Sequence, residues 1–160
     1  MTDVAALLQR LGDVEARLVE HAAAPLPSGL TDPEPGASER WEAGQVWAHI
    51  AEFVPYWLAQ IQQVISPPND EPVPFGRTKA DPGRIAAIER DRRTAPEELL
   101  RRVRAGIAEL RATLAALPPD AWSARGLHPT AGEITLPKMI EWFEVGHLEE
   151  HADQLDGLGH

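Results

Sequence analysis

Apolar side chains recur at alternating spacings of three and four residues in four separate segments of this 160-residue chain. This spacing places them along one side of an α-helix, so each segment is expected to form a helix with one buried face. The expected helices cover about residues 2–22, 42–65, 94–117 and 136–155. No segment shows the alternation of a β-strand. Amphipathic helices are stable only when their apolar faces meet, which predicts an all-α fold, a four-helix bundle formed by a single domain over residues 1–160.

The helix ends and the connections refine this prediction. Thr2 or Asp3 is expected to cap the first helix, and Thr94 with Glu97 forms a capping box for the third. Segments 24–40, 66–83 and 120–133 are expected to be loops, the first two because they are rich in proline. A connection as long as 66–83 suits a crossover between the second and third helices, which gives an up-down-down-up bundle, with a short extra helix at 84–92. Pro55, inside the second helix, predicts a bend or a local widening there.

Composition limits the classes of function. Cysteine is absent, which excludes disulfides, thiolate ligands and a cysteine nucleophile. The net charge is −10, and the clustered arginines alternate with acidic residues, so no nucleic-acid partner is expected. No apolar run is long enough for a membrane span and no secretion signal is recognisable, so a cytoplasmic location without membrane partners is expected.

Three histidines occupy positions on helix faces where leucine would be usual. His147 and His151 lie four residues apart on the apolar side of the last helix, so both rings project from one face. His49 has the same place on the second helix. Three buried imidazoles cannot all be protonated, whereas one divalent cation can accept a lone pair from each neutral ring. The pattern therefore predicts a metal site on His49, His147 and His151 that leaves a coordination position open. A metal-free cluster of hydrogen-bonded histidines is the alternative.

The order of several short motifs resembles that of the DinB/YfiT-like metalloenzyme superfamily. The matching motifs are Trp41, Gln45-Val-Trp-Ala-His49-Ile, His128-Pro129, Gly132-Glu-Ile-Thr-Leu136 and His147-Leu-Glu-Glu-His151-Ala-Asp-Gln154. They cover almost the whole chain. Two positions depart from the family pattern: Glu42 stands where a Ser or Thr cap is common, which weakens that cap, and Pro55 is unusual in the second helix.

The resemblance implies a four-helix bundle with this three-histidine site. It implies zinc or nickel as the divalent metal ion, with iron or manganese as further options. For some members it also implies transferase or isomerase activity that depends on a low-molecular-weight thiol such as mycothiol or bacillithiol. A metal that binds a thiol as thiolate lowers the pKa of that thiol, and the same metal can activate water for hydrolysis.

Other residues are candidates for supporting roles. Glu144 and Glu150 could orient a ligand histidine, although both are expected to face solvent with the other acidic residues of that helix. His128 could act as a general acid or base, or be an ordinary loop histidine. Tyr56 could line a pocket above the ion, and Trp57 is expected in the core.

These observations favour a metal-dependent enzyme, with a thiol-dependent S-transferase or isomerase as the specific hypothesis. A non-catalytic metal-binding or dimerisation bundle and a metal-dependent hydrolase are the alternatives. The expected partner is a small-molecule substrate. Pairing into a homodimer through a helix face is a further option for bundles of this kind.

Overall fold

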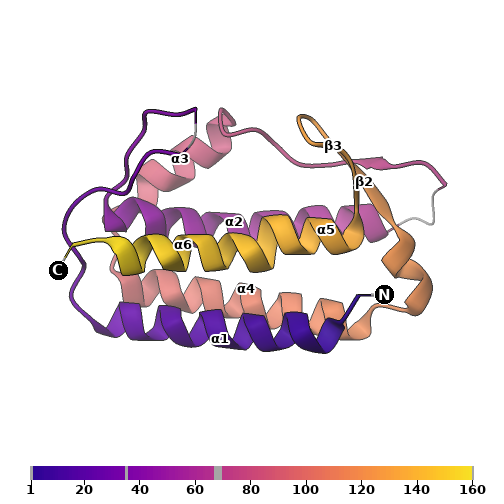
Figure 1. Cartoon of the computed structure of the whole chain (residues 1–160), viewed down its shortest axis with the longest axis horizontal. Helices are drawn as coiled ribbons and strands as arrows, with labels where there is room; N and C mark the ends of the chain where they lie inside the picture. The colour runs from indigo at the N-terminus through magenta and orange to yellow at the C-terminus, as the bar shows by residue number, and fades with distance from the viewer. Residues whose placement is uncertain (1, 35, 67–69, 160) are drawn as a thin grey trace.

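The computed structural model describes residues 2–34, 36–66 and 70–159 of the chain, and four helical rods dominate it (Figure 1). The rods are α1 (Val4–Ala23), α2 (Ala43–Ile65), α4 (Pro96–Ala116) and a composite rod of α5 (Leu136–Ile140), η2 (Glu141–Val145) and α6 (Gly146–Gly157). Figure 1 shows that α1 and the composite rod run in one direction and that α2 and α4 run in the opposite one. This is the up-down-down-up order expected from the long second connection. Residues 35 and 67–69, which lie in two of the expected loops, are outside the described residues.

The predicted apolar faces meet in the centre of the bundle. Leu11, Leu18, Ile50, Phe53 and Leu110 are fully buried. Val4 and Leu117, at the two ends of the predicted faces, are only partly buried against the same core. The helical periodicity of the sequence therefore identifies the core, because a side chain on the inner face of any rod meets side chains of the others.

The prediction of a purely helical chain is wrong. Three short strands, β1 (Val73–Pro74), β2 (Arg125–His128) and β3 (Gly132–Thr135), form a sheet in the order β1-β2-β3. β1 pairs parallel with β2, and β2 pairs antiparallel with β3 across a turn at residues 129–131. Gly132, the first residue of β3, follows this turn with a positive φ of 75°. Strands of two and four residues are too short to show an alternating pattern in a sequence.

Two further elements lie in the connections. The extra helix expected at 84–92 is present as α3 (Pro82–Asp91), and a 3₁₀ turn, η1 (Pro119–Ser123), precedes the hairpin. The predicted cap of the third rod is wrong: α4 starts after Ala95, with Pro96 in its first turn, and Thr94 donates its backbone N–H to Asp91 instead. Proline at the first helical position has a φ angle that already suits a helix, so this helix can start without a capping box.

The starts of the first two rods agree better with expectation. Asp3 caps α1 by accepting the backbone N–H of Ala6 at 3.0 Å. At the start of α2 the backbone N–H of Glu42 donates to the Gln45 side chain at 2.9 Å, so a helix end without a Ser or Thr cap is still satisfied. α2 continues as one α-helix through the exposed Pro55, without the local widening that this proline suggested.

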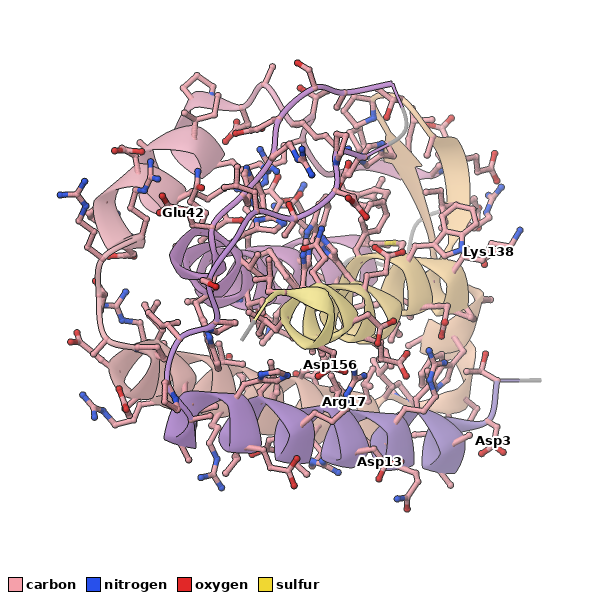
Figure 2. All side chains as sticks on the ribbon, turned by 60° about the vertical axis from the view of Figure 1, so that its left-hand side comes forward. Asp3, Asp13, Arg17, Glu42, Lys138 and Asp156 are labelled. Carbon is pink, nitrogen blue, oxygen red and sulfur yellow. The ribbon has the colours of Figure 1, made fainter. Side chains whose placement is uncertain are left out.

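Ion pairs connect α1 to the composite rod on the outside of the bundle. Arg17 contacts Asp153 at 2.7 Å and Asp156 at 2.5 Å, and Figure 2 shows Arg17 beside Asp156. Arg10 contacts Glu141 and Glu149 in the same way. These pairs fix how the composite rod lies against α1, and so contribute to the placement of the two histidines that it carries.

Within the described part of the chain, no helix combines the length and apolar character that crossing a bilayer requires. The cytoplasmic location stays a prediction.

Candidate metal centre

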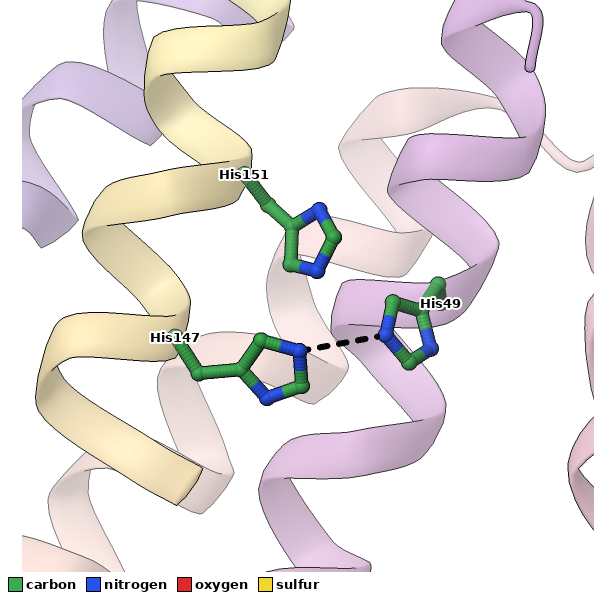
Figure 3. Close-up of side chains that lie close together, drawn as sticks. All are labelled: His49, His147 and His151. Carbon is green, nitrogen blue, oxygen red and sulfur yellow. Dashed lines mark hydrogen bonds between the residues drawn. The ribbon is translucent and has the colours of Figure 1, made fainter. Parts of the chain in front are cut away.

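The side chains of His49, His147 and His151 converge between α2 and α6. Figure 3 shows the two rings from α6 turned toward the ring from α2. One nitrogen from each ring lies within 4.8 Å of the others, and the Nε2 atoms of His49 and His147 are 3.3 Å apart. His49 and His151 are buried, at 4% and 3% exposure, and His147 is partly buried.

Each of the three rings is held from its other nitrogen. Nδ1 of His49 contacts Glu52 Oε2 at 2.8 Å, and Nδ1 of His147 contacts the carbonyl oxygen of Phe143 at 3.2 Å. Nδ1 of His151 contacts Gln154 Oε1 at 2.6 Å. All three partners are oxygen acceptors, so each ring donates from Nδ1 and presents an unprotonated Nε2.

This arrangement fits a metal ion. With Nδ1 protonated on both rings, neither Nε2 of His49 nor that of His147 carries a proton for the contact between them, and two lone pairs face each other. A cation between them removes that repulsion. His49 and His147 would hold such an ion through Nε2, and His151 would offer the third nitrogen, which lies within 4.8 Å of the other two.

Burial keeps the three rings neutral, as metal ligands must be. Burial lowers the pKa of His49 and of His147 well below the ordinary value, and the charges of neighbouring histidines act in the same direction. Burial also lowers the pKa of His151, to about 4. Neutral imidazoles are the form that binds a metal, so folding itself prepares the donors.

Glu52 is a candidate functional residue that was not predicted from the sequence. Its side chain is 7% exposed and bonds His49 on one side and the guanidinium of Arg77 on the other, at 2.5 and 2.7 Å. Burial raises the pKa of Glu52, and Arg77 opposes that rise. The signal was available in the sequence, because a carboxylate three residues after a histidine lies beside it on a helix.

A cavity of about 940 Å³ opens beside the histidines. Trp57 and Phe143, whose rings stack with centroids 4.2 Å apart, form an aromatic wall. The remaining lining includes these side chains: Glu34, Arg77, Lys79, Arg84, His128, Trp142, Glu150, Asp153 and Gln154. The size lies within the range of pockets that bind organic ligands, about 300–1,000 Å³.

The predicted supporting residues have different places. His128 is 6% exposed and lines the cavity, and its Nδ1 accepts the backbone N–H groups of Thr130 and Ala131, each at 3.2 Å. These bonds leave the proton on Nε2, and burial lowers the pKa of His128. Tyr56 is not among the cavity-lining residues; Arg77 covers its ring at 3.8 Å, and Trp57 lines the cavity in its place.

The expectation that Glu144 faces solvent is wrong. Its side chain is 0% exposed, and among the described residues neither carboxylate oxygen has a hydrogen-bond partner. Glu144 lies in the π-helical turn η2, four residues after the buried Ile140 and seven before the buried His151, so it shares the inner face of the rod with them. Burial raises the pKa of Glu144 well above its ordinary value. Glu150, by contrast, is exposed as expected.

Comparison with known proteins identifies the family. Residues 2–155 match the sequence profile of the DinB superfamily. The chain belongs to the DinB superfamily. No curated protein matches it in sequence.

Solved structures share the fold of this DinB-superfamily chain. YfiT from Bacillus subtilis, a probable metal-dependent hydrolase with a four-helix bundle of unusual topology, is 21% identical with a TM-score of 0.73, over 96% of this chain and 83% of that one. A mycothiol-dependent maleylpyruvate isomerase is 17% identical with a TM-score of 0.68, over 98% of this chain. This chain spans only 62% of the isomerase. At such identities the likeness establishes the fold alone.

A third similar structure overturns the exclusion of nucleic acid. The colibactin self-resistance protein ClbS, which is 12% identical with a TM-score of 0.64 over 96% of this chain and 93% of that one, was solved in complex with double-stranded DNA. The prediction that nucleic acid is excluded as a partner, which was drawn from the acidic composition, is therefore wrong. Net charge describes the whole surface, whereas binding depends on where the charges lie on it.

Proposed function

We propose that this member of the DinB superfamily is a metal-dependent enzyme in which His49, His147 and His151 hold one divalent cation. The observation that carries the proposal is the orientation of the rings: three Nδ1 atoms are engaged by acceptors, and the opposite side of each ring is free for an ion. Three neutral imidazoles suit zinc or nickel, and iron or manganese are the other candidates.

An ion with three protein ligands supplies Lewis-acid chemistry at its open position, where it lowers the pKa of a bound thiol or water. The chain's own residues support this chemistry. Glu52 orients His49 and makes its ring a stronger electron-pair donor to a metal, and Arg77 holds Glu52 in place. Trp57 and Phe143 limit the access of water to one side of the cavity.

The specific reaction that we propose is thiol-dependent S-transfer or isomerisation with a low-molecular-weight thiol such as mycothiol or bacillithiol. Two acid–base groups near the three rings are not free to accept a proton from a bound nucleophile, because Glu52 is held by Arg77 and Nδ1 of His128 accepts two backbone N–H groups. This favours a nucleophile that ionises without a general base, as a thiol bound to a metal does. The mycothiol dependence of the similar isomerase supports the same choice, and the likeness to YfiT supports hydrolysis as the alternative.

Metal content tests the site. Untagged native protein is expected to hold about one ion per chain, since three histidines complete one set of protein ligands. His49→Ala, His147→Ala and His151→Ala should each lose most of it by elemental analysis. His128→Ala is the matched control, because it removes a histidine of the same cavity and should keep the ion. Full metal content in all three ligand variants would contradict the assignment.

Turnover tests the reaction. Mycothiol or bacillithiol is mixed with monochlorobimane: the sulfur forms the new S–C bond, chloride leaves, and the thiol proton passes to the buffer. Native protein should accelerate this reaction, lose the effect on chelation and regain it with zinc or nickel. Chelation-sensitive ester hydrolysis without any thiol effect would select the hydrolase alternative. Bound metal with neither activity would select a non-catalytic metal-binding bundle.

A further inference from the structure

The cations around the central cavity differ in whether a carboxylate neutralises them. Arg77 is paired with Glu52, and Lys79 is paired with Glu34. Arg84 has no carboxylate within ion-pair distance among the described residues. Its Nη1 donates a hydrogen bond to the carbonyl oxygen of Lys79 at 3.0 Å, and its guanidinium lies over the Trp41 ring, 5.5 Å from the centroid. One positive charge of the cavity wall is therefore left without an ionic partner.

This charge lies close to the histidines and is poorly hydrated. Arg84 stands in the first turn of α3, is partly buried, and lines the same cavity as all three rings. Its charge contributes to the lowered pKa of each of them. Burial lowers the pKa of Arg84 itself, which indicates that its cation has lost hydration without a full replacement.

Acidic side chains offset this charge only in part. Glu39, Glu52 and Asp81 attract Arg84 from beyond ion-pair distance, and Glu52 is already bonded to Arg77. Glu34, Glu150 and Asp153 line the cavity but are exposed, so water screens their charges. The inner wall therefore favours an anion even though the whole chain carries a net charge of −10.

We propose that Arg84 is the anion-binding residue of this cavity, and that it binds the carboxylate or phosphate group of a ligand whose apolar part lies against Trp57 and Phe143. A guanidinium group matches both oxyanions with two parallel hydrogen bonds. The stacked rings of Trp57 and Phe143 offer an apolar surface in the same cavity. This inference rests on the proposed function in one respect: it names the ligand of the same site. Binding of the oxyanion to Arg84 itself needs no metal ion.

Binding of simple probes to the whole chain tests this role. Phenylacetate and phenyl phosphate carry the two oxyanions on an aromatic ring, and phenylacetamide is the neutral match of phenylacetate. Each is titrated by calorimetry into chelated and zinc-loaded protein, and the side-chain Nε–H signal of Arg84 is followed by NMR. The two anionic probes distinguish a carboxylate ligand from a phosphate ligand.

The expected result is that at least one anionic probe binds the chelated native protein and shifts the Arg84 signal, whereas the amide does not. Arg84→Gln should weaken this binding about tenfold or more, and Arg84→Lys should weaken it less, because a bidentate charged contact is lost in full or in part. Lys79→Gln is the matched control from the same wall, and its effect should be small because Lys79 is exposed and already paired.

Three outcomes would overturn the proposal: no binding of either anion at about 10 mM, equal binding of the amide, or unchanged affinity in Arg84→Gln. Near-ultraviolet circular dichroism tests whether the variants are folded. If a variant is not folded, the shift of the Arg84 signal in the native protein still decides whether the anion binds at Arg84. Arg84-dependent binding in a protein that holds no metal would leave this inference standing and reject the proposed function. Full metal content with Arg84-independent binding would do the reverse.

Discussion

The three candidate ligand rings are oriented by three chemically different acceptors. Nδ1 of His49 donates to a carboxylate, that of His147 to a backbone carbonyl and that of His151 to an amide oxygen. A carboxylate is the strongest of these acceptors and increases the electron density on the ring most. His49 is therefore expected to be the most strongly donating ligand of the set.

Substitution of Glu52 tests this difference. Glu52→Gln keeps an oxygen acceptor for His49 but removes the negative charge, and metal affinity should fall about 10- to 100-fold. The measurement is competition for zinc with a chelating dye. The same variant leaves Arg77, whose side chain is 9% exposed, with only the more distant carboxylate of Asp81 at 3.9 Å, so the free energy of unfolding should also fall by about 1–3 kcal/mol.

Glu150→Gln is the control for this variant. Glu150 directly precedes His151, and its substitution removes the same negative charge. Glu150 is exposed, however, and makes no contact with a histidine ring among the described residues. Its substitution should leave zinc affinity nearly unchanged. Equal loss in both variants would mean that Glu52 acts only through the general field of negative charge.

The fully buried carboxyl of Glu144 has a different consequence, which concerns stability. Burial raises its pKa, so the folded chain keeps a proton that the unfolded chain loses above the ordinary value of 4.5. Stability therefore falls as the pH rises above that value, by about 1.4 kcal/mol for each pKa unit of difference. Glu144→Gln should raise the free energy of unfolding at neutral pH and have little effect near pH 4, as measured by urea denaturation.

Glu109→Gln provides the comparison, because Glu109 is exposed on α4 and its substitution should matter little at either pH. If Glu144→Gln destabilises the chain at neutral pH, the carboxylate is ionised and has a partner such as buried water or an ion.

Among the elements, the π-helical turn η2 (Glu141–Val145) determines the register of the last rod. The sequence predicts one regular helix over 136–155, and the structure divides it into α5, η2 and α6. Such a turn adds a residue to the helix and rotates everything that follows. Within it, the carbonyl oxygen of Phe143 contacts Nδ1 of His147, and the side chain of Glu144 is fully buried.

Gly146, which directly follows η2, has no room for a side chain. A Cβ atom there would lie 2.6 Å from the carbonyl oxygen of Glu141. Gly146→Ala should therefore destabilise the chain by about 1–3 kcal/mol and reduce zinc affinity, because relief of the clash shifts α6. Gly157→Ala, near the end of the same helix with nothing within 4 Å, should be neutral or stabilising. Thermal unfolding and the zinc competition assay measure both effects, and equal behaviour of the two variants would contradict this role of η2.

The elements that the sequence predicted are those whose signal is local. The four rods follow from the spacing of residues such as Leu11 and Ile50, which is repeated over several turns. The sheet was missed because Val73 pairs with Gly126, more than fifty residues away, and such pairing leaves no periodic trace. The π-helical turn at Glu141–Val145 was missed because apolar periodicity over 136–155 does not distinguish such a short turn from a regular α-helix.

For the molecule as a whole, the position of charges matters more than their sum. The three histidines were predicted, because each replaces an apolar residue on a helix face. Arg77 and Arg84 could not be predicted, because they lie in the connection between α2 and α4, Arg77 before the short helix α3 and Arg84 within it. The path of this connection over the cavity is set by the tertiary fold. The net charge of −10 was the reason for expecting no nucleic-acid partner, whereas the fold places cations beside the site.

The same burial that keeps the three candidate ligands neutral makes the metal-free protein sensitive to acid. The lowered pKa values of the three rings mean that, below the ordinary value of 6.5, the unfolded chain takes up protons that the folded chain does not. Stability of the chelated protein should therefore fall as the pH decreases from about 7 to about 4, and zinc-loaded protein at neutral pH should be more stable than chelated protein.

Replacing one ring with the apolar residue that the helix face would otherwise carry separates stability from function. His151→Leu removes one of the three groups that gain a proton on unfolding, so the chelated variant should lose less stability than the chelated native chain between neutral pH and about pH 5. It should at the same time fail to retain zinc, because only two of the three ligands remain. Urea denaturation of both chelated proteins across this range, with metal analysis at neutral pH, measures the two effects. Parallel stability curves would show that His151 is protonated in the folded chain, which is incompatible with a ring held ready for a cation.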